Sequence, residues 1–319
     1  MTQYWKDLPA NWAIELRGVS KRFRRTQALS DLNLHVPIGG VHGLLGPNGS
    51  GKTTTIRMLL GLLRADQGRM FILDHQVPHQ LPAVIDRVGA VVESPHLVGN
   101  LTIQRNLEIL ALATGSPLSR VTEVLLEVGL GGRTDTLFKA CSLGMKQRVA
   151  IAATLLKRPD ILIFDEPTNG LDPAGIQEIR TTMRALAEQG RTVLVSSHLL
   201  SEIEQVANSV SIIGRGRVLA EGDLDVLLGF GQPHVVVEVE ETAFAHEVLR
   251  QAGYDCELVS GRLHVTRDGA IAAQDVARVL GQADLWPSHL SLSQASLESV
   301  FLSLTEGEHL SATQGRSAA

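Results

Sequence analysis

The pattern of apolar and polar positions divides the chain into three regions. Through about residue 225, short apolar runs alternate with helical patterns, which is typical of a largely parallel sheet covered by helices. Three of the runs are almost continuously apolar, as expected of strands buried on both faces. The predicted strands of this region are 41–46, 88–93, 161–166, 192–198 and 209–214.

Between residues 100 and 158 the apolar period changes from two to 3.6, which predicts an all-helical insertion. We place this helical subdomain at about 98–158. Cations and a proline close its last helix, as is common at helix C-termini. Three helices are predicted: one with Ile103, Leu107, Leu110 and Ala111 on a single face, one with Val121, Val124, Leu125 and Val128 that closes on Gly129, and one from about Leu143 to Arg158.

From about residue 231 the pattern changes again, and the predicted order of elements is βαββαβ. This order is typical of a small ferredoxin-like α+β domain, which we place at 231–306 after a main domain at 1–228. A final helix would carry Leu297, Val300, Phe301 and Leu304 on one face. The small, polar residues 307–319 are expected to be a disordered tail.

Composition describes an ordinary globular protein of 319 residues and argues against nucleic acid as a partner. The formal net charge is −5 and the sequence pI is about 6.1, whereas phosphate-backbone binding requires a basic surface. The stretch "KRFRR" at 21–25 is locally basic, and we interpret it as a solvated strand edge.

Membrane insertion and metal clusters built on cysteine are also disfavoured. The first residues lack the apolar core of a signal peptide, and the longest apolar run, 149–156, is too short to span a bilayer. A membrane role would therefore require a partner. Cys141 and Cys256 form no CxxC pair, so the sequence indicates neither a disulfide framework nor a zinc site, and it fits a reducing cytosol.

The stretch "GPNGSGKTTT" matches the phosphate-binding loop pattern G-x-x-x-x-G-K-[ST] between an apolar strand and a helix. Its glycines let backbone N–H groups curl around phosphate oxygens at a helix N-terminus. A lysine in this place reaches the β- and γ-phosphates, and the following hydroxyl can bind Mg²⁺. The candidate nucleotide-binding residues are Gly46, Asn48, Gly49, Ser50, Gly51, Lys52, Thr53 and Thr54.

A second motif, "ILIFDEP", ends a strand in two carboxylates. Four apolar residues bring Asp165 to the carboxyl edge of the sheet, where ligands bind in open α/β folds. Asp165 suits the Mg²⁺ shell, and Glu166 suits a base that orients or deprotonates the attacking water. Another strand-end carboxylate, Glu93 in "GAVVESPHL", would by itself be a solvated side chain.

Together these motifs resemble the ATP-binding cassette (ABC) ATPase family over residues 13–222. The stretch "CSLGMKQR" at 141–148 is similar to the family's signature, and it precedes the Asp-Glu motif at the family's spacing. The resemblance includes Asp172 in "NGLDP" as the D-loop residue and His198 in "VLVSSH" as the switch histidine. Phe23 falls where the family stacks an aromatic ring on adenine.

The resemblance implies an α/β fold: a P-loop nucleotide-binding domain with a RecA-like core, an antiparallel β subdomain and a helical subdomain. It also implies ATP and Mg²⁺, with Lys52, Glu166 and His198 in catalysis and with Thr53, Glu93 and Asp165 near the metal. Two cassettes would dimerise head to tail, so that each ATP lies between the P-loop of one copy and Ser142 and Gly144 of the other. A helix N-terminus at Ser142 suits an anion, and hydrolysis would release the two chains.

Two departures from the commonest family pattern restrict the resemblance to one branch of the family. The signature has Cys141, Leu143 and Met145 where Leu, Gly and Gln are usual, and Glu93 stands where most relatives have a glutamine that contacts Mg²⁺. These features, and "ASLESVFLSLT" near the C-terminus, resemble exporter ATPases of the bacitracin, lantibiotic-immunity and drug-transport branch. Such ATPases work on the cytoplasmic face of the membrane with a separate permease, here with an antibiotic, antimicrobial peptide or lipid as the expected cargo.

Three alternatives to an exporter ATPase fit the sequence less well. An importer ATPase remains open, although Glu93 and the C-terminal domain favour export. A non-transport ABC ATPase typically has a coiled-coil insertion, zinc-binding cysteines or a second cassette, and this sequence has none of them. A P-loop kinase or GTPase explains neither the signature nor His198.

Overall fold

A computed structural model of the chain shows two compact units, Met1–Leu224 and Asp225–Ala319, each with its own hydrophobic core. In the described part of the chain, no helix is both long enough and apolar enough to cross a membrane. The residues that the structure describes are 2–6, 11–24, 26–92, 97–229, 233–259, 261–267, 269, 271–293, 296–301 and 304.

A seven-stranded, mostly parallel sheet forms the centre of the first unit, in the order β1-β11-β10-β4-β9-β8-β7. Strands β10, β4, β9, β8 and β7 are parallel to their neighbours in this series, whereas β11 pairs antiparallel with β10. Every residue of β9 is buried, as expected of a central strand covered on both faces. The strands are β1 (Thr2–Tyr4), β4 (Gly40–Leu45), β7 (Val88–Val91), β8 (Ile161–Asp165), β9 (Thr192–Ser197), β10 (Ser209–Gly214) and β11 (Arg217–Asp223).

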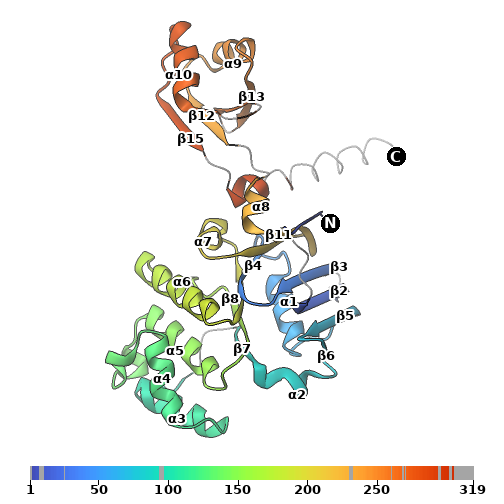
Figure 1. Ribbon diagram of the computed structural model, residues 1–319, viewed down its shortest axis with the longest axis vertical. Helices are drawn as coiled ribbons and strands as arrows, with labels where there is room; N and C mark the ends of the chain where they lie inside the picture. Colours follow the sequence, from blue (N-terminus) through green and yellow to red (C-terminus); the bar gives the residue numbers. More distant parts are fainter. Residues whose placement is uncertain are drawn as a thin grey trace. The chain divides into compact units, whose positions relative to one another are not determined.

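A second, antiparallel sheet of four strands lies beside it in the order β3-β2-β5-β6 (Figure 1). Its two long strands form a hairpin that ends in the pair Phe23 and Thr26. The apolar residues on one face of β2 and β3 are fully buried in the main core. The strands are β2 (Trp12–Phe23), β3 (Thr26–Pro37), β5 (Gln67–Ile72) and β6 (His75–Val77).

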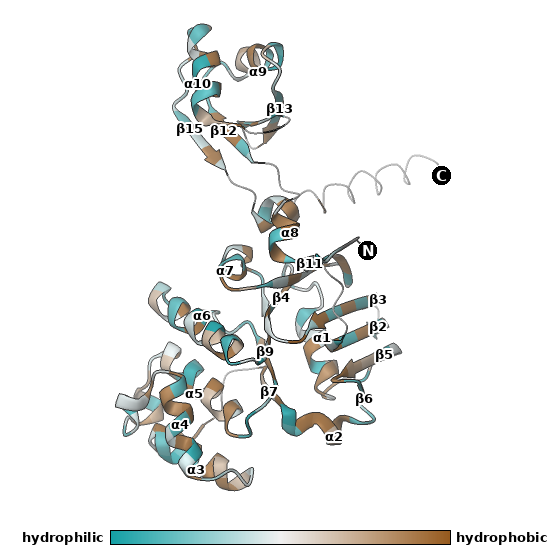
Figure 2. Cartoon of the chain, in the orientation of Figure 1, coloured by the Kyte–Doolittle hydropathy of each residue, from teal (hydrophilic) through white to brown (hydrophobic). Residues whose placement is uncertain are grey.

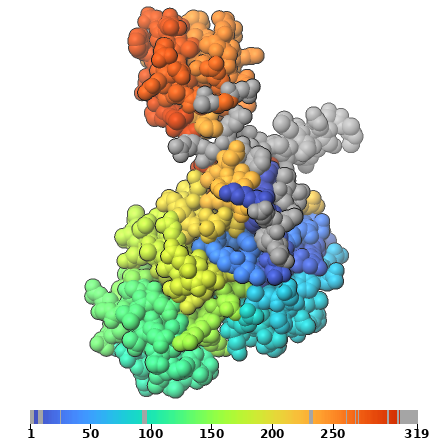
Figure 3. Space-filling view, in the orientation of Figure 1, coloured from blue at the N-terminus to red at the C-terminus, as the bar shows by residue number. Residues whose placement is uncertain are grey.

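Three helices, α3, α4 and α5, pack on one another and form a helical subdomain, drawn in green in Figure 1 and seen as one continuous lobe in Figure 3. Two of them begin at hydroxyl caps, Thr102 for α3 and Ser142 for α5, whose side chains each accept a backbone N–H. The helices and short 3₁₀ turns of this region are α3 (Ile103–Ala113), α4 (Ser119–Glu127), η2 (Gly131–Arg133), η3 (Phe138–Ala140) and α5 (Leu143–Leu155).

The other helices of the first unit pack on its sheets. Helix α1 contacts β8, and α6 contacts β4 and β9. Figure 2 shows both hydrophobic and hydrophilic residues along α6, as expected of a helix with one buried face. These elements are α1 (Lys52–Leu59), α2 (Leu81–Val84), η1 (Ile85–Arg87), α6 (Pro173–Glu188) and α7 (Leu200–Glu204). Helix α8 (Leu224–Gly229) follows at the division between the units.

The second unit contains a four-stranded antiparallel sheet in the order β13-β14-β12-β15, with α9 and α10 packed on it. The elements follow the chain order βαββαβ of a ferredoxin-like fold. Residues 297–301 are helical. The elements are β12 (His234–Glu238), α9 (Thr242–Gln251), β13 (Asp255–Val259), β14 (Arg262–Thr266), α10 (Ala273–Gln282) and β15 (His289–Ser293).

The predicted α/β fold class is confirmed by the seven-stranded sheet and the helices that cover it. The strand expected at 88–93 is shorter than predicted and ends at Val91. The division between the units lies at residue 224, four residues before the expected boundary. The expected tail, 307–319, lies outside the described residues.

Candidate functional site

The P-loop connects strand β4 to helix α1 and depends on two glycines for its close packing. A Cβ atom at Gly46 would lie 2.2 Å from the carbonyl oxygen of Ile213, and one at Gly51 would lie 2.4 Å from Leu29 Cδ2. Gly51 also has a φ of 111°, which side-chain-bearing residues rarely adopt. The loop therefore reaches this shape only with glycine at both places, and it delivers Lys52 as the first residue of α1.

Lys52 is buried, and its ammonium group is held by the loop that precedes it. Nζ donates to the carbonyl oxygens of Gly46 at 2.7 Å and of Pro47 at 3.3 Å. Its side chain is 5% exposed, which is unusual for lysine unless the charge is paired. The pairing carboxylate is Glu166, whose Oε1 lies 3.3 Å from Nζ.

Glu166 follows the last residue of β8 and has a left-handed backbone conformation, with a φ of 50°. A non-glycine residue in this region costs about 1–3 kcal/mol and is often found at functional sites. Its N–H is within hydrogen-bonding distance of Ser196 on the neighbouring strand β9, 2.9 Å from Oγ and 3.2 Å from the carbonyl oxygen. The adjacent strand thus holds Glu166 in a strained place at the sheet edge.

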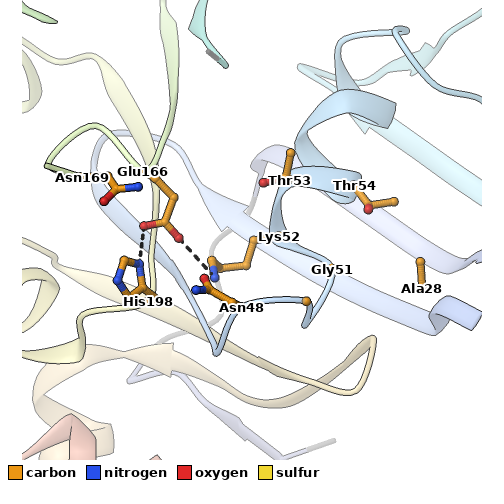
Figure 4. Close-up of a pocket in the computed structure, with 10 residues that line it drawn as sticks. Ala28, Asn48, Gly51, Lys52, Thr53, Thr54, Glu166, Asn169 and His198 are labelled. Carbon is orange, nitrogen blue, oxygen red and sulfur yellow. Dashed lines mark hydrogen bonds and ion pairs between the residues drawn. The ribbon is translucent and has the colours of Figure 1, made fainter. Parts of the chain in front are cut away.

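Two further side chains fix the carboxylates of this edge. His198 Nδ1 lies 2.7 Å from Glu166 Oε2, and Ser196 Oγ donates to Asp165 Oδ1 at 2.5 Å. Glu166 is therefore contacted through both carboxylate oxygens, by Lys52 on one side and by His198 on the other (Figure 4). Such a carboxylate can accept a proton from water in the cavity while its position is kept.

A cavity of about 320 Å³ opens over these residues. Its lining is mainly polar and comes from the P-loop, from the segment after β8 and from the end of β9, as Figure 4 shows. The lining residues are Ala28, Asn48, Gly49, Gly51, Lys52, Thr53, Thr54, Glu166, Asn169 and His198.

Most of the nucleotide-binding residues expected from the sequence are thus brought together. Gly46 and Ser50 are not among the lining residues. The carbonyl oxygen of Gly46 accepts from Lys52 Nζ, and Ser50 Oγ is a buried hydroxyl without a hydrogen-bond partner in the described part of the chain. Sequence reasoning missed Ala28, Asn169 and Ser196. The first serine of "VSSH", two residues before the histidine, is the one signal that could have indicated Ser196.

A magnesium ion fits the oxygen donors of this site. Thr53 offers a hydroxyl at the start of α1, and Asp165 offers a carboxylate oriented by Ser196. The described residues contain no cluster of three or more His, Cys, Asp or Glu side chains able to hold a metal by themselves. Mg²⁺ is usually bound through one or two protein groups together with substrate phosphates.

Ser142, Gly144 and Asp172 do not line this cavity. Ser142 caps α5, accepting the N–H of Met145 at 3.2 Å, and Asp172 caps α6, accepting the N–H of Gly175 at 3.1 Å. A Cβ at Gly144 would lie 3.7 Å from Gly175 Cα, so the two helix starts are neighbours. Burial raises the pKa of the preceding Cys141 thiol, which keeps it uncharged beside this helix start.

Phe23 also lies outside the cavity lining, at the tip of the β2–β3 hairpin with its side chain 43% exposed. Beside it, the interpretation of "KRFRR" as a solvated strand edge is wrong for Lys21. That side chain is 13% exposed and paired with Asp66, because a loop distant in sequence folds against the strand end. Glu93 lies outside the described residues, so its predicted contact with the metal stays a prediction.

Comparison with known proteins identifies similar chains along almost the whole sequence. A family model described as "ABC transporter" matches residues 29–169. The bacitracin transport ATP-binding protein BcrA of Enterococcus faecalis is 34% identical over 93% of this chain and 97% of its own length. The daunorubicin/doxorubicin resistance ATP-binding protein DrrA of Streptomyces peucetius is 36% identical, with 92% of each chain covered. A solved structure of an ABC transporter's ATP-binding subunit matches with a TM-score of 0.60 at 30% identity, over 68% of this chain and 92% of that one.

Proposed function

The chain belongs to the ATP-binding proteins of the ABC transporter family, which are ATPases that power transport, and we propose that it drives export through a separate membrane permease. The family match and the similar proteins confirm the sequence-based assignment to the bacitracin, lantibiotic and drug-resistance branch. The observation that carries the proposed chemistry is the position of Glu166 between Lys52 and His198 in one cavity.

Binding of ATP is assigned to the P-loop side of the cavity. The N–H groups at the start of α1 and the Lys52 ammonium would face the phosphates, since both attract anions. Ser50 supplies a buried hydroxyl that has no hydrogen-bond partner in the described residues. Thr53 and Asp165 would hold Mg²⁺, which neutralises charge on the phosphates when bound.

Hydrolysis is assigned to Glu166 and His198. Glu166 would orient an attacking water and accept its proton, because its carboxylate borders the cavity and is held on both sides. His198 keeps that carboxylate in place and can itself contact the terminal phosphate. Asn169, whose N–H donates to the Glu166 carbonyl at 3.1 Å, helps to fix the turn that follows.

The separation of the signature from the cavity supports the proposed dimerisation. Ser142 and Gly144 start a helix, where anions are favoured, but they do not line the cavity of their own chain. A second copy placed head to tail would bring its Ser142, Gly144 and Asp172 to the γ-phosphate. ATP would then hold two chains together, and hydrolysis would let them part.

The class of transported molecule and the cellular location of the chain are inferred from its relatives. These relatives are named for transport of bacitracin or for resistance to daunorubicin and doxorubicin, so an antibiotic, antimicrobial peptide or lipid is the proposed class of cargo. The chain would act on the cytoplasmic side, bound to its permease and to a second copy of itself. Import remains the second candidate, because the nucleotide chemistry would be the same.

Two measurements test this proposal. Purified protein with Mg²⁺ should release phosphate from ATP, and Lys52→Ala should weaken ATP binding, because it removes the charge facing the phosphates. In cells that express the chain with a co-encoded membrane protein, efflux of fluorescent daunorubicin and resistance to bacitracin should both require Lys52. ATP hydrolysis with no effect on either drug would remove the proposed cargo class, and accumulation in place of efflux would establish import.

A further inference from the structure

One loop residue, Asp66, fixes the end of strand β2. Its Oδ1 accepts from Lys21 Nζ at 2.8 Å, and its Oδ2 accepts from the Arg22 N–H at 2.7 Å. Its own N–H donates to the carbonyl oxygen of Ser20 at 2.9 Å. Three consecutive residues of β2 are therefore tied to one aspartate. The bonds from Lys21 and from the Arg22 N–H lower the pKa of the Asp66 carboxyl, the Lys21 bond most strongly.

The lysine held by Asp66 lies over the ring of Phe23. Lys21 Nζ is 5.5 Å from the ring centroid, within the range of a cation–π contact. The hairpin tip thus presents an aromatic ring with a cation on one face, while the Phe23 side chain remains 43% exposed.

The exposed ring lies at the end of the hairpin, close in sequence and pairing to the part of β3 that lines the nucleotide cavity. Phe23 pairs directly with Thr26, so these two side chains lie on the same face of the sheet. Ala28, two residues further along β3, lies where the pairing with β2 shifts register, and it lines the cavity beside the P-loop. The distance from Thr26 to Ala28 along the strand is about 7 Å, which is within the reach of a nucleotide whose phosphates lie at Lys52.

We propose that Asp66 and Lys21 form a positioning pair that holds the Phe23 ring for the base of the bound nucleotide. Lys21 covers one face of the ring, so the base stacks on the other. This inference rests on the proposed ATP binding and adds two residues that do not touch the nucleotide themselves. It also gives a function to Lys21, which lies in a basic stretch that the sequence pattern predicts to be solvent-facing charge.

The Asp66–Lys21 pair should affect binding of the base and should not affect hydrolysis. Stacking on an aromatic ring is the same before and during phosphoryl transfer, so losing it raises KM for ATP and leaves kcat unchanged. A ligand without a base, such as inorganic tripolyphosphate, uses the P-loop alone and gains nothing from the pair. A structural role of Lys21 and Asp66 would instead weaken both ligands or lower kcat.

The experiment uses calorimetry on the full chain to compare its affinity for ATP with its affinity for tripolyphosphate. The proteins measured are wild type, Lys21→Met, Lys21→Arg and Asp66→Asn. Lys21→Met keeps the length of the side chain and removes its charge, and we expect it to weaken ATP binding about three- to ten-fold. Tripolyphosphate affinity and kcat should stay at the wild-type values. Lys21→Arg should restore ATP affinity, because arginine can pair with Asp66 and stack on the ring.

The chain offers a matched control in Arg17, which pairs with Glu15 at 2.6 Å and lies 4.9 Å from the Phe71 ring centroid, away from the cavity lining. Arg17→Met should leave ATP affinity unchanged. In a Phe23→Ala background, Lys21→Met should have no further effect, since the ring through which it acts is gone. Equal loss of ATP and tripolyphosphate affinity, or an unchanged affinity for ATP in Lys21→Met, would overturn the proposal. Failure of Lys52→Ala to weaken either ligand would instead overturn the nucleotide site.

Discussion

His198 Nδ1 lies 2.7 Å from Glu166 Oε2, although 32 residues separate the two in the sequence. Adjacent parallel strands, β8 and β9, end side by side and bring the imidazole and the carboxylate to one edge of the sheet. The same carboxylate is 3.3 Å from Lys52 Nζ. The position of Glu166 is therefore set by groups from two other segments of the chain.

Removing the imidazole should expose its role in placing Glu166. We expect His198→Ala to lower kcat for ATP hydrolysis by about 10²-fold, the lower end of the range for groups that act on proton transfer. KM for ATP should change little, because the P-loop is intact. Steady-state phosphate release measures both constants, with His289→Ala, an exposed histidine of the second unit, as the control. A kcat within two-fold of wild type would contradict this role for His198.

Ser196 bonds to both acidic residues of the site. Its Oγ donates to Asp165 and accepts the N–H of Glu166, and its side chain is fully buried. We expect Ser196→Ala to lower kcat by about ten-fold and to raise the Mg²⁺ concentration needed for half-maximal rate, because a group that orients a metal ligand typically contributes this much. The matched control is Ser197→Ala, since Ser197 is also buried but bonds to Leu199. Equal effects of the two substitutions would show that Ser196 acts only through packing.

A buried histidine outside the site should make stability depend on pH. His42 lies between Ser209 and Ser211, with each ring nitrogen 2.8 Å from a hydroxyl oxygen. Burial, and secondly the nearby His35, lowers the pKa of His42 to about 3. The unfolded chain therefore binds a proton below about pH 6.5 that the folded chain takes up only near pH 3.

The sign of this effect is a loss of stability with acid. As pH falls from about 6.5 towards 3, His42 should reduce the free energy of unfolding by up to about 1.4 kcal/mol per pH unit. The measurement is urea unfolding at several pH values for wild type and His42→Gln, whose amide can bond to both serines but does not titrate. The difference between the two curves should grow as pH falls. Parallel curves would mean that His42 takes up its proton over the same pH range in the folded and the unfolded protein.

The sequence predicted the chemical groups of this site better than the contacts that position them. The motifs that contain Lys52, Glu166 and His198 lie at the ends of predicted strands. In a parallel α/β fold these strand ends meet at one edge of the sheet, so the sequence predicts that the three side chains lie close together. Ser196 was missed because its role depends on the register of β8 against β9. Lys21 was misread because its partner, Asp66, comes from a loop that no local pattern connects to β2. The roles of Ser142, Gly144, Asp172 and Glu93 stay predictions.

The central claim is that ATP binding in the Lys52–Glu166 cavity joins two copies of the chain through the Ser142 helix. Glu166→Gln keeps the shape of the side chain, so it should bind ATP, lose turnover and remain in the ATP-bound state. The direct measurement is sedimentation velocity of Glu166→Gln, with and without ATP and Mg²⁺, beside the double variant Glu166→Gln with Ser142→Arg. We predict a monomer without nucleotide, a dimer with ATP, and a monomer in both conditions for the double variant. A Glu166→Gln protein that binds ATP but stays monomeric, or a dimer that ignores both nucleotide and Ser142→Arg, would contradict the account.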